Sequence, residues 1–181
     1  NLTNLFETLT NLRIPTIAVV SGAAYGGAVG LVAACDYAIA TDTAKFCLSE
    51  VKLGLLPAVI LPYLGRKISN GDLRRLSLSA KVFDSKEAED IELVQIVTTT
   101  DNLYQTVIKE INNLLAAGPV AQRALKTLLD QVRESHFQQS DLTVNAIAEA
   151  RTGDEGQAGL GAFFEKKSPP WQLKMKDDWK L

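Results

Sequence analysis

A glycine-rich turn between two apolar segments is the first part of the sequence whose residues could do chemistry. It runs Ser21-Gly22-Ala23-Ala24-Tyr25-Gly26-Gly27 and is followed by a run of small apolar residues that ends at Cys35. Glycines in such a turn permit positive φ and a close approach by a ligand. If a helix follows, its N-terminus offers unpaired N–H groups and the positive end of its dipole. Such a turn can stabilise an oxyanion on a thioester carbonyl or bind a phosphate.

The turn does not match the common nucleotide-binding patterns. No Gly-Lys-Ser/Thr follows it, as Walker A requires, and its spacing is not G-x-G-x-x-G. The glycines are equally compatible with close packing of a helix on a strand, with no ligand involved. Both interpretations remain open at this stage.

Glu50 is the second candidate because it is a carboxylate in apolar surroundings. Phe46-Cys47-Leu48 precedes it, and the largely apolar stretch 53–61 follows. Apolar surroundings disfavour the charged form of a carboxyl group, which suits general acid/base catalysis. The alternatives are a solvated turn residue or an ion pair with Lys52.

Other catalytic or metal-binding arrangements have little support. The single histidine, His136, lies in a polar stretch, so a Ser-His-Asp triad is not predicted. Cys35 and Cys47 lack partners at the spacing of a zinc site, and no metal is expected. Because both cysteines lie in apolar runs, we expect buried thiols in a reducing compartment.

The elements that must position these residues alternate in the first half of the chain. Apolar spacing predicts a helix over residues 1–12, and the β-branched run 16–20 predicts a strand buried on both faces. A buried helix is expected over 23–35, followed by short strands at 37–40 and 46–48. This alternation is typical of an α/β core.

The second half is predicted to be mainly helical. One further strand is expected at 94–98, and the break at Gly118-Pro119 separates two helices. The predicted helices span residues 63–69, 72–78, 85–93, 103–115, 121–132, 141–151 and 154–166. We therefore expect an α/β part over residues 1–100 and a helical part over residues 101–181.

Composition and charge limit the classes of protein further. The 181 residues are 46% hydrophobic and 22% charged, which excludes a disordered tail, a collagen and a disulfide-stabilised mini-protein. A net charge of −2 lacks the overall basic character of a nucleic-acid binder. No apolar run of about 18 residues predicts a membrane span, and no secretory signal is visible. A cytoplasmic location is expected.

Two long motifs resemble the signature of the crotonase superfamily, the enoyl-CoA hydratase/isomerase family. They are residues 15–27 and residues 49–54, and the segment 148–171 looks like the family's C-terminal segment. The resemblance covers essentially the whole chain. Within the family, residues 30–36 and 48–60 are most similar to bacterial methylglutaconyl-CoA hydratase-like proteins.

The resemblance implies a crotonase-like ββα-type α/β core followed by a helical region that mediates oligomerisation. Homotrimers or dimers of trimers are the implied assemblies. The family's first oxyanion-hole donor lies in an upstream segment shaped like Ser-Ala-Gly-x-Asp-Leu, which nothing before Pro15 matches. The family core is therefore expected to be N-terminally incomplete in this chain, which would begin in the helix before the second oxyanion-hole strand.

The resemblance also assigns roles to individual residues. The family's second oxyanion-hole donor falls on the N–H of Gly27, and its catalytic glutamate falls on Glu50. Lys166 and Lys167 are expected to meet CoA phosphates, the alternative being solvated lysines at a helix end. The full set of implied substrate-binding residues is Gly26, Tyr25, Ala24, Gly30, Pro57, Phe163, Lys166 and Lys167, with Phe163 or Phe164 as a wall of the acyl pocket.

The implied activity is addition of water across the 2,3 double bond of an enoyl-CoA, such as a methylglutaconyl-CoA-like substrate. No metal or redox cofactor is expected, because CoA is part of the substrate. Many hydratases carry a second glutamate where this chain has Gly30, so a double-bond isomerase that uses Glu50 alone is an alternative. A truncated, non-catalytic paralogue that binds CoA or assembles is the third interpretation.

Overall fold

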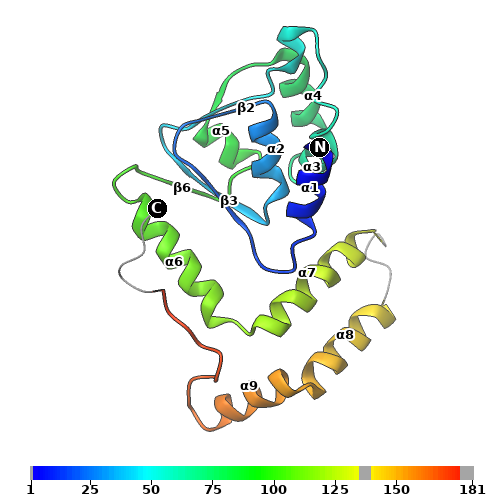
Figure 1. Ribbon diagram of the computed structural model, residues 1–181, viewed down its shortest axis with the longest axis vertical. Coiled ribbons are helices and arrows are strands. Elements are labelled where there is room, and N and C mark those ends of the chain that lie inside the picture. The colour runs from blue at the N-terminus through cyan, green and yellow to red at the C-terminus, as the bar shows by residue number, and fades with distance from the viewer. Residues whose placement is uncertain (1, 135–139, 176–181) are drawn as a thin grey trace. The chain divides into compact units, whose positions relative to one another are not determined.

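The computed structural model describes residues 2–134 and 140–175 of the chain (Figure 1). The described residues form two compact units, each with its own set of internal contacts. Unit 1 contains residues 2–12 and 16–107, and unit 2 contains residues 13–15 and 108–175.

The first sheet of unit 1 consists of three parallel strands. Its order is β1 (Ile17–Val20), β3 (Tyr37–Thr41) and β6 (Ile96–Thr98). In β1, Val20 joins the apolar core, but Val19 is 38% exposed. Successive side chains of a strand point to opposite faces, and only the face that carries Val20 is covered at this end of β1. The prediction of a strand buried on both faces is therefore wrong.

The second sheet of unit 1 joins β2 (Ala23–Tyr25), β4 (Lys45–Cys47) and β5 (Phe83–Asp84). Strands β2 and β4 are parallel, with Tyr25 opposite Cys47, and β5 is antiparallel to β4. The helix predicted from residue 23 is therefore wrong at its start. A run of small apolar residues fits a strand or a buried helix equally well, and pairing with β4 decides between them.

Helix α2 (Gly27–Ala34) follows β2 and is buried over most of its length. It packs against α1 (Leu2–Thr10) and α3 (Leu61–Leu64), and these helices form part of the core of unit 1. The largest fully buried side chains of this core include Phe6 of α1 and Phe46 of β4. The core therefore holds α2 against strands β1, β2 and β3.

The remaining helical segments of unit 1 are short. They are the 3₁₀ helix η1 (Glu50–Leu53), α4 (Asn70–Ser79) and α5 (Ser85–Asp90). Ser69 and Asp84 cap α4 and α5, because each side chain accepts a hydrogen bond from a first-turn N–H group. Neither η1 nor β5 was predicted from the sequence pattern.

The described part of unit 2 is helical, as the sequence predicts. It contains the end of α6 (Leu103–Ala116), α7 (Pro119–Glu134), α8 (Ser140–Thr152) and α9 (Asp154–Phe164). Helix α7 packs along α8, and α9 contacts both. The boundary predicted after residue 100 lies just before α6, whereas the two units divide inside this helix.

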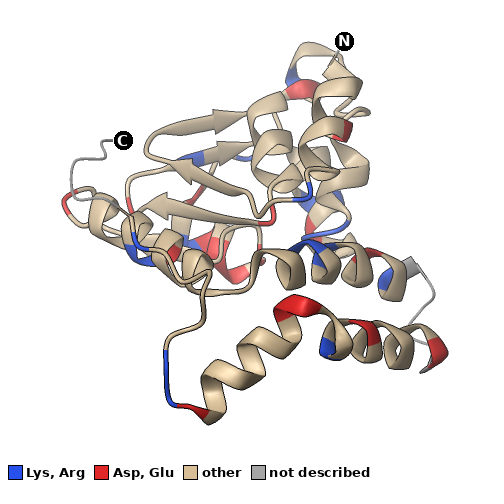
Figure 2. Ribbon diagram, turned by 60° about the horizontal axis from the view of Figure 1, so that its bottom comes forward, with Lys and Arg blue, Asp and Glu red and all other residues tan. Residues whose placement is uncertain are grey.

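Charged residues of both signs are spread over the helices. Lys and Arg are interspersed with Asp and Glu in both units (Figure 2). Among the residues that the structure describes, no helix combines the length and the apolar character needed to cross a membrane.

A charged cluster joins α4 to α5 in unit 1. The Arg75 guanidinium donates hydrogen bonds to Asp72 at 2.9 Å and to Glu87 at 2.7 Å, and Lys81 Nζ donates to Glu87 at 2.9 Å. The hydrogen bonds from Arg75 and Lys81, with the larger effect from Arg75, hold the pKa of Glu87 below its ordinary value of 4.5. The two ion pairs of Glu87 therefore favour the folded state only while this carboxyl group is ionised.

We expect Glu87→Gln to lower the melting temperature by about 2 °C at pH 7, because it removes two partly exposed ion pairs. A carboxyl whose folded pKa is depressed stabilises above its unfolded pKa, and this contribution is lost as the pH falls through the folded pKa. The difference from wild type should therefore vanish well below pH 4.5. Thermal unfolding followed by circular dichroism between pH 2 and 7 measures this difference in melting temperature.

Glu7→Gln is the control, since this exposed carboxylate has no ion pair among the described residues. A pH-independent difference would contradict the prediction.

Gly30 allows α2 to lie against the start of α3. A Cβ at this position would lie 2.2 Å from Ile60 Cγ2 and 2.8 Å from Ile60 Cβ, closer than real Cβ atoms approach a neighbour, and 3.0 Å from Phe6 Cζ. Ile60 is only 2% exposed and immediately precedes α3. Gly30 lies one helical turn after Gly27, and the side chains of Ile60 and Phe6 fill the space where its own side chain would be.

We expect Gly30→Ala to lower the free energy of unfolding by about 1–3 kcal/mol, because the added methyl group overpacks the core. Urea denaturation measures this. Gly27→Ala is the matched control in the same helix, since a Cβ there meets nothing within 4 Å. The control should leave stability unchanged or raise it slightly, because alanine is a better helix former than glycine. Equal destabilisation by the two variants would contradict the packing argument.

Candidate functional site

The start of α2 leaves two backbone donors without acceptors. Gly26 precedes the helix at φ 54° and ψ −123°, a conformation that favours glycine. Its N–H donates to the Cys47 carbonyl at 2.8 Å, and its own carbonyl accepts from Val29 at 2.9 Å. The N–H groups of Gly27 and Ala28 have no acceptor within the described part of the chain. Both residues are half-buried, so these donors can bind a ligand.

Glu50 lies beside this helix start because β4 pairs with β2. Tyr25 is opposite Cys47, and the chain then turns into η1, which begins at Glu50. Gly54, at φ 70°, ends this short helix, and Leu55 donates its N–H to the Glu50 carbonyl at 3.0 Å. The 3₁₀ turn thus fixes the backbone from which the Glu50 side chain extends.

The carboxyl group of Glu50 is directed at Gly26. A Cβ added to Gly26 would lie 3.1 Å from Glu50 Oε1, so any other residue here would press on this carboxyl group. Glu50 is half-buried, and its Oε2 is fully buried with no hydrogen-bond partner among the described residues. Buried polar atoms almost always have a partner, so this one points to a ligand or a bound water.

The space in front of Gly27 is open. A Cβ added at this position would meet nothing within 4 Å. The structure thus brings together the Gly26-Gly27 turn and Glu50, as the sequence interpretation requires. A carboxylate beside two unpaired amide groups can move a proton next to a carbonyl oxygen that the amides hold.

The other candidates in unit 1 lie in different environments. Tyr25 is 45% exposed next to Gly26, so its side chain is available to a ligand. Ala24 and Pro57 are buried, and Gly30 is buried against Ile60. Ala24, Gly30 and Pro57 therefore expose no side chain to a ligand. Their substrate-binding roles stay predictions.

The candidates in unit 2 lie at and beyond the end of α9. Phe163 is 75% exposed, and Lys166 adopts φ 55° just after the helix. Lys167 forms an exposed ion pair with Glu165 at 2.8 Å, which fits the alternative of solvated lysines at a helix end. Contact of Phe163, Lys166 and Lys167 with acyl-CoA stays a prediction.

The residues of the weaker chemical alternatives are only partly described. His136 lies outside the described residues. Cys47 is buried, and its Sγ donates to the Ala80 carbonyl at 3.3 Å, whereas Cys35 is half-buried rather than fully buried as expected. Within the described ranges, no group of three or more His, Cys, Asp or Glu residues could hold a metal ion.

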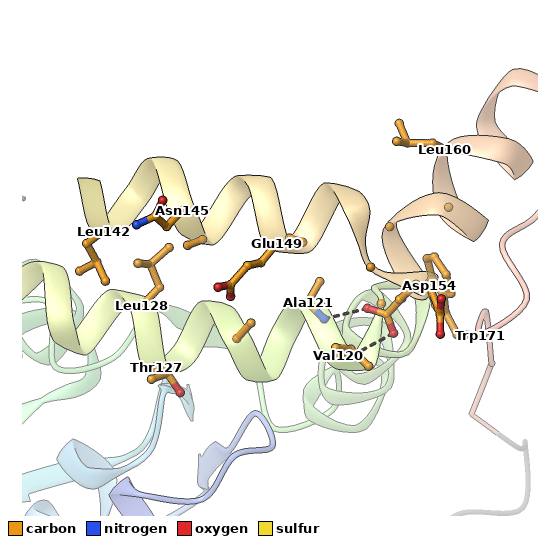
Figure 3. Close-up of a pocket in the computed structure, with 18 of the residues that line it drawn as sticks. Val120, Ala121, Thr127, Leu128, Leu142, Asn145, Glu149, Asp154, Leu160 and Trp171 are labelled. Atoms are coloured by element: carbon orange, nitrogen blue, oxygen red, sulfur yellow. Dashed lines mark hydrogen bonds between the residues drawn. The ribbon is translucent and has the colours of Figure 1, made fainter. Parts of the chain in front are cut away.

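Unit 2 contains a cavity that sequence reasoning missed. It has a volume of about 880 Å³ and lies between α7, α8 and α9, with Leu128, Leu142 and Trp171 among its apolar walls (Figure 3). At one end, the Glu155 carboxylate accepts hydrogen bonds from the N–H groups of Val120 at 2.9 Å and Ala121 at 2.7 Å. A residue of α9 therefore caps α7, and no local sequence signal indicates this pairing.

The ordered glycine turn, the facing glutamate and the helical region after the α/β unit are together the arrangement of the crotonase superfamily. The sequence profile of the Enoyl-CoA hydratase/isomerase family matches residues 1–174, and the chain belongs to this family. Mitochondrial methylglutaconyl-CoA hydratase of Homo sapiens is 33% identical over 175 residues, which are 93% of this chain and 51% of the relative. Probable enoyl-CoA hydratase echA8 of Mycobacterium tuberculosis is 34% identical over 163 residues, 89% of this chain and 63% of the relative.

Solved structures of the family have the same fold. A putative enoyl-CoA hydratase/isomerase (crotonase) from Legionella pneumophila matches with a TM-score of 0.89 at 43% identity, over 94% of this chain and 66% of that one. An enoyl-CoA hydratase from Shewanella pealeana matches with a TM-score of 0.87 at 41% identity, over 94% and 64%. The predicted crotonase-like α/β fold with a helical C-terminal region is confirmed. The chain spans between half and two thirds of the length of the curated relatives that it matches.

We expect Glu155→Ala to lower the free energy of unfolding by about 1 kcal/mol, because it leaves two N–H groups at the start of α7 without their carboxylate acceptor. Chemical denaturation measures this loss. Glu149→Ala is the matched control, since this carboxylate lines the same cavity without a side-chain hydrogen bond among the described residues. Equal stability of the two variants would contradict a capping role for Glu155.

Proposed function

We propose that the chain carries the acid/base and oxyanion-binding groups of an enoyl-CoA hydratase. The observation that carries this proposal is the buried, unpartnered Oε2 of Glu50 beside a helix start with unpartnered N–H groups. Membership of the enoyl-CoA hydratase/isomerase family supports an acyl-CoA thioester as the substrate. No further cofactor is needed, because CoA is itself part of the substrate.

Hydration begins with the thioester oxygen bound at the start of α2. The N–H of Gly27 donates to this oxygen and draws electron density from the conjugated double bond, so that C3 becomes electrophilic. Glu50 then takes a proton from a water molecule as the water oxygen attacks C3. The resulting enolate oxygen is stabilised by the same N–H group, and losing one such donor typically costs ~10²–10³ in rate.

The second proton transfer completes the addition. Glu50, now protonated, returns its proton to C2, and the enolate collapses to the 3-hydroxyacyl thioester. The position three residues after Gly27 is Gly30, which Ile60 covers, so no second carboxylate stands there. Because one carboxylate handles both transfers, the hydrogen and the hydroxyl group arrive on the same face of the double bond.

The finer features of the substrate and the assembly belong to the same proposal. A methylglutaconyl-like acyl group is supported by the human relative, which is named methylglutaconyl-CoA hydratase. Exposed Tyr25 next to Gly26 is proposed to contact the acyl group. Phe163, Lys166 and Lys167 are proposed to contact the acyl-CoA, in a cytoplasmic homotrimer or dimer of trimers.

A double-bond isomerase is the second candidate function. It is favoured by the single carboxylate, because shifting the double bond from C3–C4 to C2–C3 requires only that one group take a proton from C2 and return it to C4. Incubation with a 2-enoyl-CoA in water and with a 3-enoyl-CoA separates the two activities. Formation of a 3-hydroxyacyl-CoA supports the hydratase, and conversion of the 3-enoyl to the 2-enoyl thioester alone supports the isomerase.

We expect Glu50→Gln to lower turnover of a 2-enoyl-CoA by about 10³-fold, because the amide cannot take up the proton of water. Binding of a saturated acyl-CoA, measured by isothermal titration calorimetry, should change little. Glu92→Gln is the control, since it removes an exposed carboxylate of the same unit. Wild-type turnover by Glu50→Gln would overturn the assignment. Binding without turnover by the unmodified protein would favour a non-catalytic CoA-binding role.

A further inference from the structure

Helix α9 is tied to α7 at its start by two hydrogen bonds. All residues of α9 lie in the described part of the chain, and none of them is buried. In its first turn, the two oxygens of the Glu155 carboxylate each accept one N–H, from Val120 at 2.9 Å and from Ala121 at 2.7 Å (Figure 3). Hydrogen bonds to a charged acceptor are stronger than those between neutral groups. Because no core holds α9, this pair of bonds has a large share in fixing it.

Two glycines make room for this connection. A Cβ at Gly118 would lie 2.5 Å from Glu155 Oε1 and 2.9 Å from its Cδ. A Cβ at Gly156 would lie 2.0 Å from the carbonyl oxygen of Ala150 in α8. Real Cβ atoms do not approach a neighbour within 3.0 Å, so a side chain at either position would displace what lies beside it. The start of α9 is therefore packed closely against both other helices.

The far end of α9 carries the two lysines that are proposed to contact acyl-CoA. Lys166 donates its N–H to the Phe163 carbonyl at 3.1 Å, and Lys167 donates to the Ala162 carbonyl at 2.8 Å. These bonds attach the backbone of both lysines to the last turn of the helix. An α-helix rises about 1.5 Å per residue, so Phe163 lies about 12 Å along the axis from Glu155. The direction of α9 therefore decides where both lysines lie.

The chain beyond the lysines also packs on α9. A Cβ at Gly159 would lie 2.8 Å from Cη2 of Trp171, so the indole ring lies directly against the helix backbone. The segment between α9 and Trp171 is thus attached to α9 at both of its ends. A tilt of α9 would carry the two lysines with it.

We propose that Glu155 is a positioning residue for substrate binding. By fixing the start of α9, it holds Lys166 and Lys167 where their ammonium groups meet the phosphates of CoA. The inference rests on the proposed acyl-CoA function and adds to it a residue that does not touch the substrate. Groups that are already in place lose less conformational freedom when a ligand binds. Without the Glu155 carboxylate, this ordering has to occur during binding.

Steady-state kinetics of Glu155→Ala test the proposal. We expect the variant to raise KM for a 2-enoyl-CoA about tenfold and to leave kcat within twofold of wild type, since binding is lost and the reacting groups are unchanged. A purely structural role would give a different result, because a partly unfolded population lowers kcat and leaves KM unchanged. Glu149→Ala is the matched control, since this carboxylate lines the same cavity without a side-chain hydrogen bond among the described residues.

Two further variants examine the same contact. Glu155→Gln keeps an acceptor oxygen and should restore most of the affinity. Gly118→Ala should reproduce the rise in KM, because its methyl group displaces the carboxylate from the α7 amides. Gly161→Ala is the control for the added methyl group, since a Cβ there meets nothing within 4 Å, and it should keep the wild-type KM.

A truncated substrate separates positioning of the lysines from general damage to the protein. The N-acetylcysteamine thioester of the same 2-enoyl acid lacks the phosphates and the adenine of CoA. Glu155→Ala should therefore convert it with the kcat/KM of wild type. An equal loss with both substrates would overturn the inference, and so would a wild-type KM of Glu155→Ala for the 2-enoyl-CoA.

The double variant Lys166→Ala/Lys167→Ala distinguishes failure of the inference from failure of the proposed function. Its KM for the 2-enoyl-CoA should rise at least tenfold, and adding Glu155→Ala should raise KM no further, because both changes remove the same contacts. If KM rises in the lysine variant but not in Glu155→Ala, only the inference is wrong. If the lysine variant keeps the wild-type KM, or the unmodified protein neither binds nor converts acyl-CoA, the proposed function is wrong on this point and the inference with it.

Discussion

The pairing of β2 with β4 is the constraint on which the candidate site depends. It aligns Tyr25 with Cys47, and the hydrogen bond from Gly26 N–H to the Cys47 carbonyl extends the ladder to the last residue before α2. Glu50 follows Cys47 by three residues and reaches Gly26 only in this register. A slip by one residue would reverse the faces of the strand and separate the carboxyl group from the helix start.

The candidate site contains polar groups without hydrogen-bond partners, an arrangement that lowers the stability of the fold. A buried carboxylate oxygen and two amide groups without acceptors each forgo a hydrogen bond that water would supply to the unfolded chain, at about 1–3 kcal/mol for a fully buried group. Gly26 adopts a conformation that other residues rarely take. The apolar core around Phe46 and Val29 offsets these costs. Unpaired groups held in place by a rigid core are already oriented for a ligand and lose little entropy when it binds.

Sequence reasoning reached the features that local pattern determines. The α/β alternation and the helical second half follow from residue types at regular spacing. The ordered motifs led to the Gly26-Gly27 turn and to Glu50, which the structure brings together. It failed where distant parts of the chain decide the structure. Residues 23–25 form a strand because β4 lies beside them, and the Glu155 cap joins α9 to Ala121 of α7, 34 residues earlier in the sequence. The periodicity of the sequence predicts neither the pairing of β2 with β4 nor the contact of Glu155 with α7, since both depend on how distant elements pack.

Two glycines one helical turn apart serve opposite purposes, and this difference limits the chemistry. At Gly27 the absent side chain leaves open space beside an unpaired N–H, whereas at Gly30 the same absence is filled by Ile60 and Phe6. A side chain at the second position would have to displace the core, so α2 cannot contribute a carboxylate there without repacking α1 and α3. The helix can therefore supply only backbone donors to this site. In the proposed hydration, both proton transfers are therefore assigned to Glu50, which follows the neighbouring strand pair and lies outside the helix.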